Sequence, residues 1–133
     1  PLTTGSAAAR WPHSEGGDVS ILCAGDRGPL SLEDVVCAGL LVARLSGSGV
    51  ATLSEGGGTA LALGPYYGGR LDRLAEASPW ARRLARQGRG ADVAACLRAD
   101  VSDVVPVFAV GGFVPRRVSS SGLAAVAHPE SGS

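Results

Sequence analysis

One short stretch of the chain combines glycine, carboxylate, hydroxyl and guanidinium groups. In order, these residues are Gly25, Asp26, Arg27, Gly28, Ser31, Glu33 and Asp34. Glycine lets the backbone approach a ligand closely, and a guanidinium can pair with a phosphate or a sulfonate as a planar fork. Carboxylates beside a bound anion suggest a divalent cation between them, and hard oxygen ligands suit Mg²⁺. The residue types therefore indicate a site for an anion together with a cation.

The elements on either side of this stretch are predicted to be a strand and a helix. Residues 19–23 (Val-Ser-Ile-Leu-Cys) are apolar and partly β-branched, which is typical of a buried strand. Ser31 can cap the following helix, with Asp34 three residues later, and the helix should end in the breaker cluster at residues 46–49. Ligands of open α/β sheets bind at the carboxyl ends of strands, and helix N-termini favour anions. The turn between strand and helix is therefore the candidate site.

Each of these residues also has a purely structural alternative. Ser31 and Asp34 form a capping box, and the helix dipole alone stabilises acidic residues in a first turn. Glu33 is not needed for that box and projects about 100° away around the helix. Arg27 could be a solvated loop charge. The sequence leaves these alternatives open.

The composition excludes several classes of protein. The chain has 133 residues, which suits one domain, and its twelve arginines balance twelve acidic residues. No global field therefore draws it to nucleic acid or to anionic lipid. The longest apolar stretch, residues 35–42, is too short to span a bilayer, and residues 1–17 lack the apolar core of a secretion signal. These features predict a cytoplasmic protein, and the missing initiator Met suggests a piece of a longer one.

Two further sets of residues are predicted to be structural. The three cysteines, Cys23, Cys37 and Cys96, have apolar neighbours and match no metal motif, so we expect reduced thiols in the core. The basic stripe is predicted to be a solvated helix face, with RNA contact as a distant alternative. It consists of Arg82, Arg83, Arg86 and Arg89.

The predicted organisation is a flexible N-terminal segment (1–18), an α/β domain (19–114) and a disordered tail (115–133). Residues 1–18 could instead be the remnant of a helix. A marginal helix from Thr59 should break at Gly64 and Pro65. Three short helices (70–77, 80–87 and 91–98) and a strand (103–110) should follow, with Pro106 at a sheet edge. Two strands cannot cover these helices, so the fold class is a three-layer α/β/α arrangement with a mixed sheet that is incomplete in this chain.

Three segments together resemble the C-terminal half of the 2-phosphosulfolactate phosphatase family. The first, residues 19–39, has an apolar strand, an Ala-Gly loop, a Glu-Asp pair and a following Ala-Gly. The second contains Ser78, Leu84, Gly88, Asp92 and Cys96. The third is residues 100–108 (Asp-Val-Ser-Asp-Val-Val-Pro-Val-Phe). The resemblance covers roughly residues 19–114, and its first segment is the most specific.

This resemblance implies a Mg²⁺-dependent phosphatase that converts 2-phospho-3-sulfolactate to 3-sulfolactate and phosphate, a step of the kind used in coenzyme M biosynthesis. By matching position, Glu33 and Asp34 would face the metal or substrate pocket, with Gly25 and its loop near the anion. Together with the residue types, this predicts catalytic and metal-binding roles for Glu33 and Asp34 and substrate binding by Gly25, Arg27 and Ser31. The family's earlier half is not found among these residues. The alternatives are a non-catalytic α/β module that packs on a partner, and a phosphatase for another small anionic phosphomonoester. A homo-oligomer is compatible with each.

Overall fold

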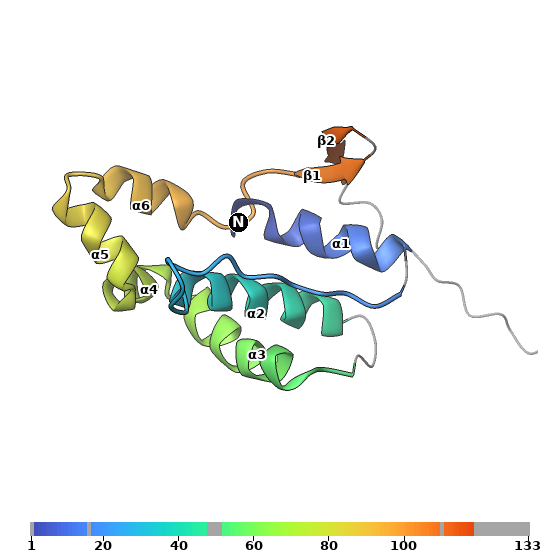
Figure 1. The fold of residues 1–133 in the computed structure, drawn as a ribbon, viewed down its shortest axis with the longest axis horizontal. Coiled ribbons are helices and arrows are strands. Elements are labelled where there is room, and N and C mark those ends of the chain that lie inside the picture. Colours follow the sequence, from blue (N-terminus) through green and yellow to red (C-terminus); the bar gives the residue numbers. More distant parts are fainter. Residues whose placement is uncertain (1, 16, 48–51, 110, 119–133) are drawn as a thin grey trace, which may run out of the picture.

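The computed structural model describes residues 2–15, 17–47, 52–109 and 111–118. In these residues, a short 3₁₀ helix, six α-helices and two strands follow one another (Figure 1). Their bounds are Leu2–Thr4 for the 3₁₀ helix, then α1 Gly5–Glu15, α2 Leu32–Ser46, α3 Glu55–Gly68, α4 Leu71–Ala77, α5 Pro79–Arg86, α6 Gly90–Cys96, β1 Val104–Ala109 and β2 Gly112–Arg117. The α/β class and its incompleteness are confirmed, because six helices accompany a single two-stranded sheet in the described residues.

Helix α2 lies at the centre of the fold, with α1 and α3 packed against it. Its predicted start and end are confirmed: the Ser31 hydroxyl accepts a hydrogen bond from the Asp34 N–H at 3.3 Å, and Gly47 caps the other end. The contact with α3 is made through backbone atoms. A Cβ on Gly39 would collide with the Ala60 carbonyl, and one on Gly64 would collide with the backbone at Gly39. Only glycine fits at this crossing.

The predicted bounds of the second helix were wrong, because α3 begins before the glycine run and continues past Pro65. The Ser54 hydroxyl caps the helix by accepting from the Gly57 N–H at 3.2 Å, so the glycine run forms the first turn. Intrinsic propensity disfavours glycine there by about 1 kcal/mol per residue. Tertiary packing against α2, which needs a glycine at position 64, outweighs that propensity.

The predicted strand at residues 19–23 is also wrong. These residues have no regular secondary structure, and the segment runs along α2 (Figure 1). We call residues 19–24 the open segment. No hydrogen bond joins its backbone to any other residue that the structure describes. A strand needs a hydrogen-bonded neighbour, and β-branched residues alone cannot supply one.

The two strands form an antiparallel hairpin in which Pro106 lies opposite Pro115. The prediction of a strand around Pro106 at a sheet edge is confirmed. Proline has no N–H, so this pair occupies a position without ladder hydrogen bonds, and both ring nitrogens face outward. Val105 is buried, and β1 contacts α1, whereas Phe108 and Phe113 are exposed with their rings 5.3 Å apart.

The predicted boundaries at the two ends need correction. Residues 2–15 are helical and α1 packs against α2, so the helical alternative holds there and the flexible one does not. At the other end, residues 115–117 belong to β2, whereas a tail was predicted from residue 115. The rest of that tail, residues 119–133, lies outside the described residues.

A polar clasp joins three parts of the chain beside α1. The Arg44 guanidinium on α2 contacts the Asp100 carboxylate at 2.8 Å and the Ser6 hydroxyl at 3.1 Å, and Asp100 also accepts from the Ser6 N–H at 2.6 Å. Burial acts to raise the pKa of Asp100, but the bonds from Ser6 and the charge of Arg44 outweigh it and lower that pKa below its usual value. The clasp therefore holds Asp100 as a carboxylate.

The three predicted short helices are confirmed as α4, α5 and α6. Ala81, Leu84 and Val93 form a small buried cluster between α5 and α6. Within the described ranges, no helix combines the length and the apolar character needed to cross a bilayer.

Candidate functional site

The turn between the open segment and α2 is tight and shaped by its glycines. Gly25, Arg27 and Gly28 all have positive φ, at +74°, +56° and +107°. The Asp26 N–H donates to the Pro29 carbonyl at 3.0 Å and closes the turn. A Cβ on Gly25 would lie 3.1 Å from the same carbonyl, so glycine is required both by conformation and by space.

Asp34 ties this turn to the start of α2. Its Oδ2 accepts a hydrogen bond from the Gly25 N–H at 2.8 Å, while its own N–H donates to Ser31. The predicted capping box is therefore half confirmed: the serine caps the helix, but the carboxylate bonds to the turn instead of reaching back to the cap. The Gly25 N–H is thus occupied within the chain.

Glu33 points in another direction and joins α2 to the junction of α4 and α5. Its Oε1 accepts from the Ser78 hydroxyl at 2.8 Å, and that serine is 1% exposed. The Ser78 oxygen in turn accepts from the Ala81 N–H at 3.0 Å. The sequence identified Ser78 only as a helix cap; a link to a residue 45 positions earlier has no local signal.

Four of the five predicted site residues line one pocket of about 530 Å³. They are Gly25, Ser31, Glu33 and Asp34. The remaining one, Arg27, is exposed and is not among the residues that line it. The other walls of the pocket are mostly apolar and come from the open segment, α2 and the α5–α6 region. The structure therefore brings the carboxylates and the hydroxyl together in one pocket lining, and the predicted anion-binding side chain of Arg27 is not part of that lining.

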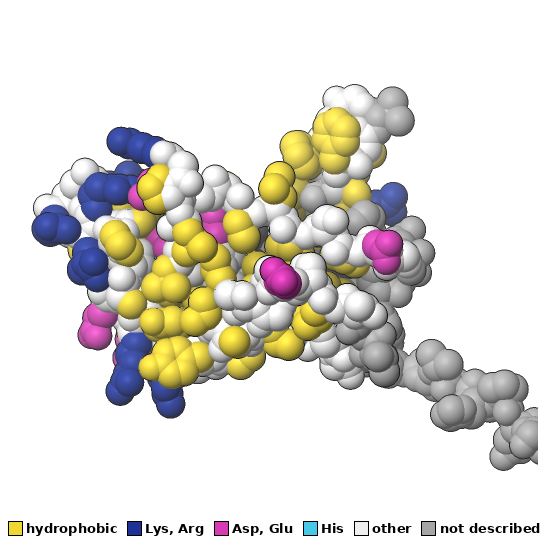
Figure 2. All heavy atoms as spheres, turned by 60° about the horizontal axis from the view of Figure 1, so that its bottom comes forward, with side chains coloured by type: hydrophobic (Ala, Val, Ile, Leu, Met, Phe, Trp, Pro, Cys, Tyr) yellow, Lys and Arg dark blue, Asp and Glu magenta, His cyan; other side chains and the backbone are white. Residues whose placement is uncertain are grey.

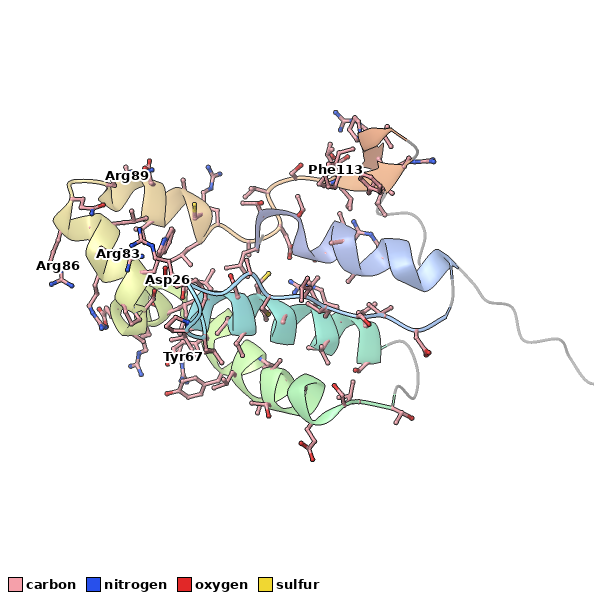
Figure 3. All side chains as sticks on the ribbon, viewed as in Figure 1. Asp26, Tyr67, Arg83, Arg86, Arg89 and Phe113 are labelled. Atoms are coloured by element: carbon pink, nitrogen blue, oxygen red, sulfur yellow. The ribbon has the colours of Figure 1, made fainter. Side chains whose placement is uncertain are left out.

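The charge of the pocket wall is negative. Asp26, Glu33 and Asp34 line it, and no arginine does among the residues described. Arg83 of α5 reaches Asp26 from outside, with its Nη2 3.1 Å from Oδ2 and 3.3 Å from Oδ1 (Figure 3). The sequence placed Arg83 only on a solvated stripe. An anion in this pocket would need positive charge from Arg27, from Arg83 after release of Asp26, or from groups outside the described residues.

The described residues do not by themselves fit a magnesium ion. They contain no group of three or more histidine, cysteine, aspartate or glutamate side chains placed to hold a metal. One oxygen of Glu33 and one of Asp34 already accept hydrogen bonds from the chain. Mg²⁺ prefers six oxygen ligands, of which two carboxylates supply only a part.

The three cysteines line the same pocket as free thiols. The core location predicted for them is wrong for Cys23 and Cys96, which are exposed, and Cys37 is only partly buried. Desolvation, together with the nearby Asp34 and Cys37, raises the pKa of Cys23. A raised pKa keeps the thiol protonated at neutral pH and makes it a poor nucleophile.

The predicted basic stripe is exposed, as expected for a solvated face. Arginine side chains gather at the end of the molecule formed by α4, α5 and α6 (Figure 2). Two members of the stripe have acidic partners: Arg83 pairs with Asp26, and Arg89 pairs with Asp92 at 2.7 Å.

Comparison with known proteins gives a consistent result. Residues 2–111 match the family model described as 2-phosphosulpholactate phosphatase. The protein named probable 2-phosphosulfolactate phosphatase of Pseudothermotoga lettingae is 32% identical over 97 residues, which are 72% of this chain and 42% of that protein. The protein of the same name from Symbiobacterium thermophilum is 35% identical over 98 residues, 73% of this chain and 42% of its own length. The chain thus spans about two fifths of the curated relatives that it matches.

Proposed function

Because this chain belongs to the 2-phosphosulpholactate phosphatase family, we propose that it forms part of a phosphatase for 2-phospho-3-sulfolactate. The reaction is hydrolysis of a phosphomonoester: water attacks phosphorus, the bond from phosphorus to the ester oxygen breaks, and 3-sulfolactate and phosphate result. The observation that carries the proposal is the family match over residues 2–111, which includes the whole Gly25–Asp34 turn and its pocket.

The turn offers three donors for an anion. The backbone N–H groups of Leu32 and Glu33 begin α2 and bond to no described residue, because the capping bonds of Ser31 go to residues 34 and 35. The Arg27 guanidinium, in the turn that precedes α2, is exposed and has no partner in the described part of the chain. Helix N-termini and arginine both stabilise the negative charge that spreads over phosphoryl oxygens during transfer.

The carboxylates have positioning roles in this proposal. Asp34 holds the turn through the Gly25 N–H, and Glu33 holds α2 against the α4–α5 junction through Ser78. The described residues do not by themselves assemble a magnesium site, so Mg²⁺ would need further ligands from outside them. Activity with Mg²⁺ compared with activity in EDTA tests the predicted requirement.

The alternative function is a non-catalytic module that packs on a partner. One observation favours it: the pocket wall holds three carboxylates and, in the described residues, no arginine. A phosphomonoester that also carries a sulfonate and a carboxylate would be repelled by such a wall unless other residues complete the site.

The test is phosphate release from 2-phospho-3-sulfolactate and from a panel of other phosphomonoesters. The chain is assayed alone and together with the part of the Symbiobacterium thermophilum relative that it does not match, with Mg²⁺ or with EDTA. We expect release only from the combination, and Arg27→Ala should lower kcat/KM about 10- to 100-fold. Arg73→Ala, which removes an exposed arginine of α4, should change it less than about twofold.

Each other outcome has a definite meaning. Preferred hydrolysis of another phosphomonoester would correct the substrate, and an equal effect of Arg27→Ala and Arg73→Ala would remove Arg27 from the site. Absence of release from every substrate, with and without the added polypeptide, would leave the packing module as the function.

A further inference from the structure

The open segment carries a row of backbone groups without partners. Residues 19–24 follow the surface of α2, and neither their N–H groups nor their carbonyls bond to another described residue. Backbone polar groups in folded proteins nearly all have partners, and those of an extended segment are satisfied by a neighbouring strand or by water. The open segment thus presents a strand edge of about six residues to its surroundings.

The open segment has apolar residues at consecutive positions, which is the composition of a strand that is buried on both faces of its sheet. Val19 and Ile21 are 45% and 37% exposed, whereas Leu22, which follows Ile21 directly, is 97% exposed. Ile21, Leu22 and Cys23 all line the pocket over α2. The high exposure of Leu22 nevertheless shows that the described residues leave its side chain almost uncovered.

The hairpin, by contrast, has edges that resist pairing. Pro106 and Pro115 face outward on β1 and β2, and each removes the central N–H of its edge. The rings of Phe108 and Phe113 remain exposed on one face of the hairpin. Its edges, however, do not present a continuous row of backbone N–H donors. Of the open segment and the hairpin, the open segment is therefore the one that is suited to accept a strand.

We propose that the open segment is a docking edge for a β-strand from the part of the family polypeptide that this chain does not span. The docked strand would hydrogen-bond to residues 19–24, and the element that carries it would cover Leu22. More than half of each curated relative lies outside the matched region, so a polypeptide of sufficient length exists in the family. The pocket beside the segment, with Ile21, Leu41 and Leu97 in its wall, offers space for an apolar side chain of that strand.

This proposal concerns binding and holds whether or not the complex hydrolyses a phosphomonoester. The probe is the unmatched part of the Symbiobacterium thermophilum relative, co-expressed with the full 133-residue chain. We expect the two to purify together, and backbone amide exchange at residues 19–24 to slow at least about tenfold relative to the chain alone.

Two matched variants distinguish specific docking at the open segment from non-specific hydrophobic association. Leu22→Ala should weaken the complex about tenfold, because the leucine becomes buried on docking. Leu30→Ala changes the same residue type at 74% exposure outside the open segment, and it should alter affinity less than about twofold.

Three results would overturn the proposal. One is failure of the two polypeptides to purify together. Another is co-purification with protection at Phe108 and Phe113, or at the arginines of α5 and α6, but not at residues 19–24. The third is equal protection of residues 19–24 in the chain alone at high concentration, which would make a second copy the occupant. A complex that forms as expected but releases no phosphate would contradict the proposed function and leave this inference standing.

Discussion

Helix α2 meets α3 through backbone atoms at Gly39 and Gly64, and along another side it lies against the open segment, whose backbone bonds to no other described residue. Both contacts involve apolar sequence. The first is complete within this chain, because the groups on both sides of it are present. In the second contact, the open segment has the residue types of a strand but, among the described residues, no neighbouring strand to pair with. The difference shows that a strand-like sequence pattern does not form a strand without a hydrogen-bonding neighbour.

The largest effect is expected at the complete contact. Gly64→Ala places a methyl group against the backbone of α2 at Gly39, which cannot move aside as a flexible side chain could. We expect the free energy of unfolding to fall by about 3 kcal/mol or more, as overpacking of a rigid site does. Urea unfolding followed by circular dichroism measures it.

A second glycine of the same helix provides the control. Gly58 has no atom within 4 Å of the position that a Cβ would take. Gly58→Ala should therefore raise the free energy of unfolding by about 0.5–1 kcal/mol through helix propensity. If both alanine variants change stability alike, the contact between α2 and α3 is not the backbone contact described above.

A smaller effect is expected at the polar clasp beside α1. The pKa of Asp100 is lowered in the folded chain, so its stabilising effect is fully present above its unfolded pKa of about 3.9 and is lost as the pH falls through the folded value. Asp100→Asn should cost about 1 kcal/mol at pH 7, a figure held down by solvent screening because the side chain is 34% exposed. Asparagine tolerates the positive φ of +52° at this position.

The pH dependence distinguishes the charge from the hydrogen bonds. The difference in unfolding free energy between the original chain and Asp100→Asn should shrink as the pH is lowered from 5 to about 2. Asp18→Asn, at an exposed acid outside the helices and strands and without a described partner, is the control and should change the unfolding free energy by less than about 0.5 kcal/mol at pH 7. A constant difference for Asp100→Asn across that range would show that the charge plays no part.

The sequence predicts this fold well where the signal is local. The Ser31 cap, the Ser78-Pro79 start of α5 and the strand around Pro106 are each encoded within a few residues, and each is confirmed. The bounds of helix α3 could not be predicted from sequence, because the packing of Gly64 against α2 offsets the low helix propensity of its glycines and has no local signal. The prediction of a strand in the open segment fails for the opposite reason. Its residues have a high strand propensity, but a strand also needs a second segment to pair with.

The candidate site shows the same contrast between local features, which the sequence predicts, and long-range contacts, which it does not. The turn and the half-buried carboxylates were found from residue types, whereas their partners were not: Gly25 for Asp34, Ser78 for Glu33 and Arg83 for Asp26. Two of these contacts join residues 45 and 57 positions apart, and no periodicity reports such distances. Long-range pairing therefore decided which carboxylate oxygens are occupied.

The smallest effect on stability is expected at the open segment, and that small effect is informative. Leu22 is 97% exposed, so Leu22→Ala should change the unfolding free energy of the chain by less than about 0.5 kcal/mol. Leu74→Ala, the same substitution at a fully buried leucine of α4, should cost about 2–5 kcal/mol in the same measurement. A leucine that contributes nothing to the isolated chain yet carries affinity for an added strand belongs to a contact between polypeptides. Should Leu22→Ala instead destabilise the chain as much as Leu74→Ala does, the side chain is already covered, and the contrast between the two sides of α2 disappears.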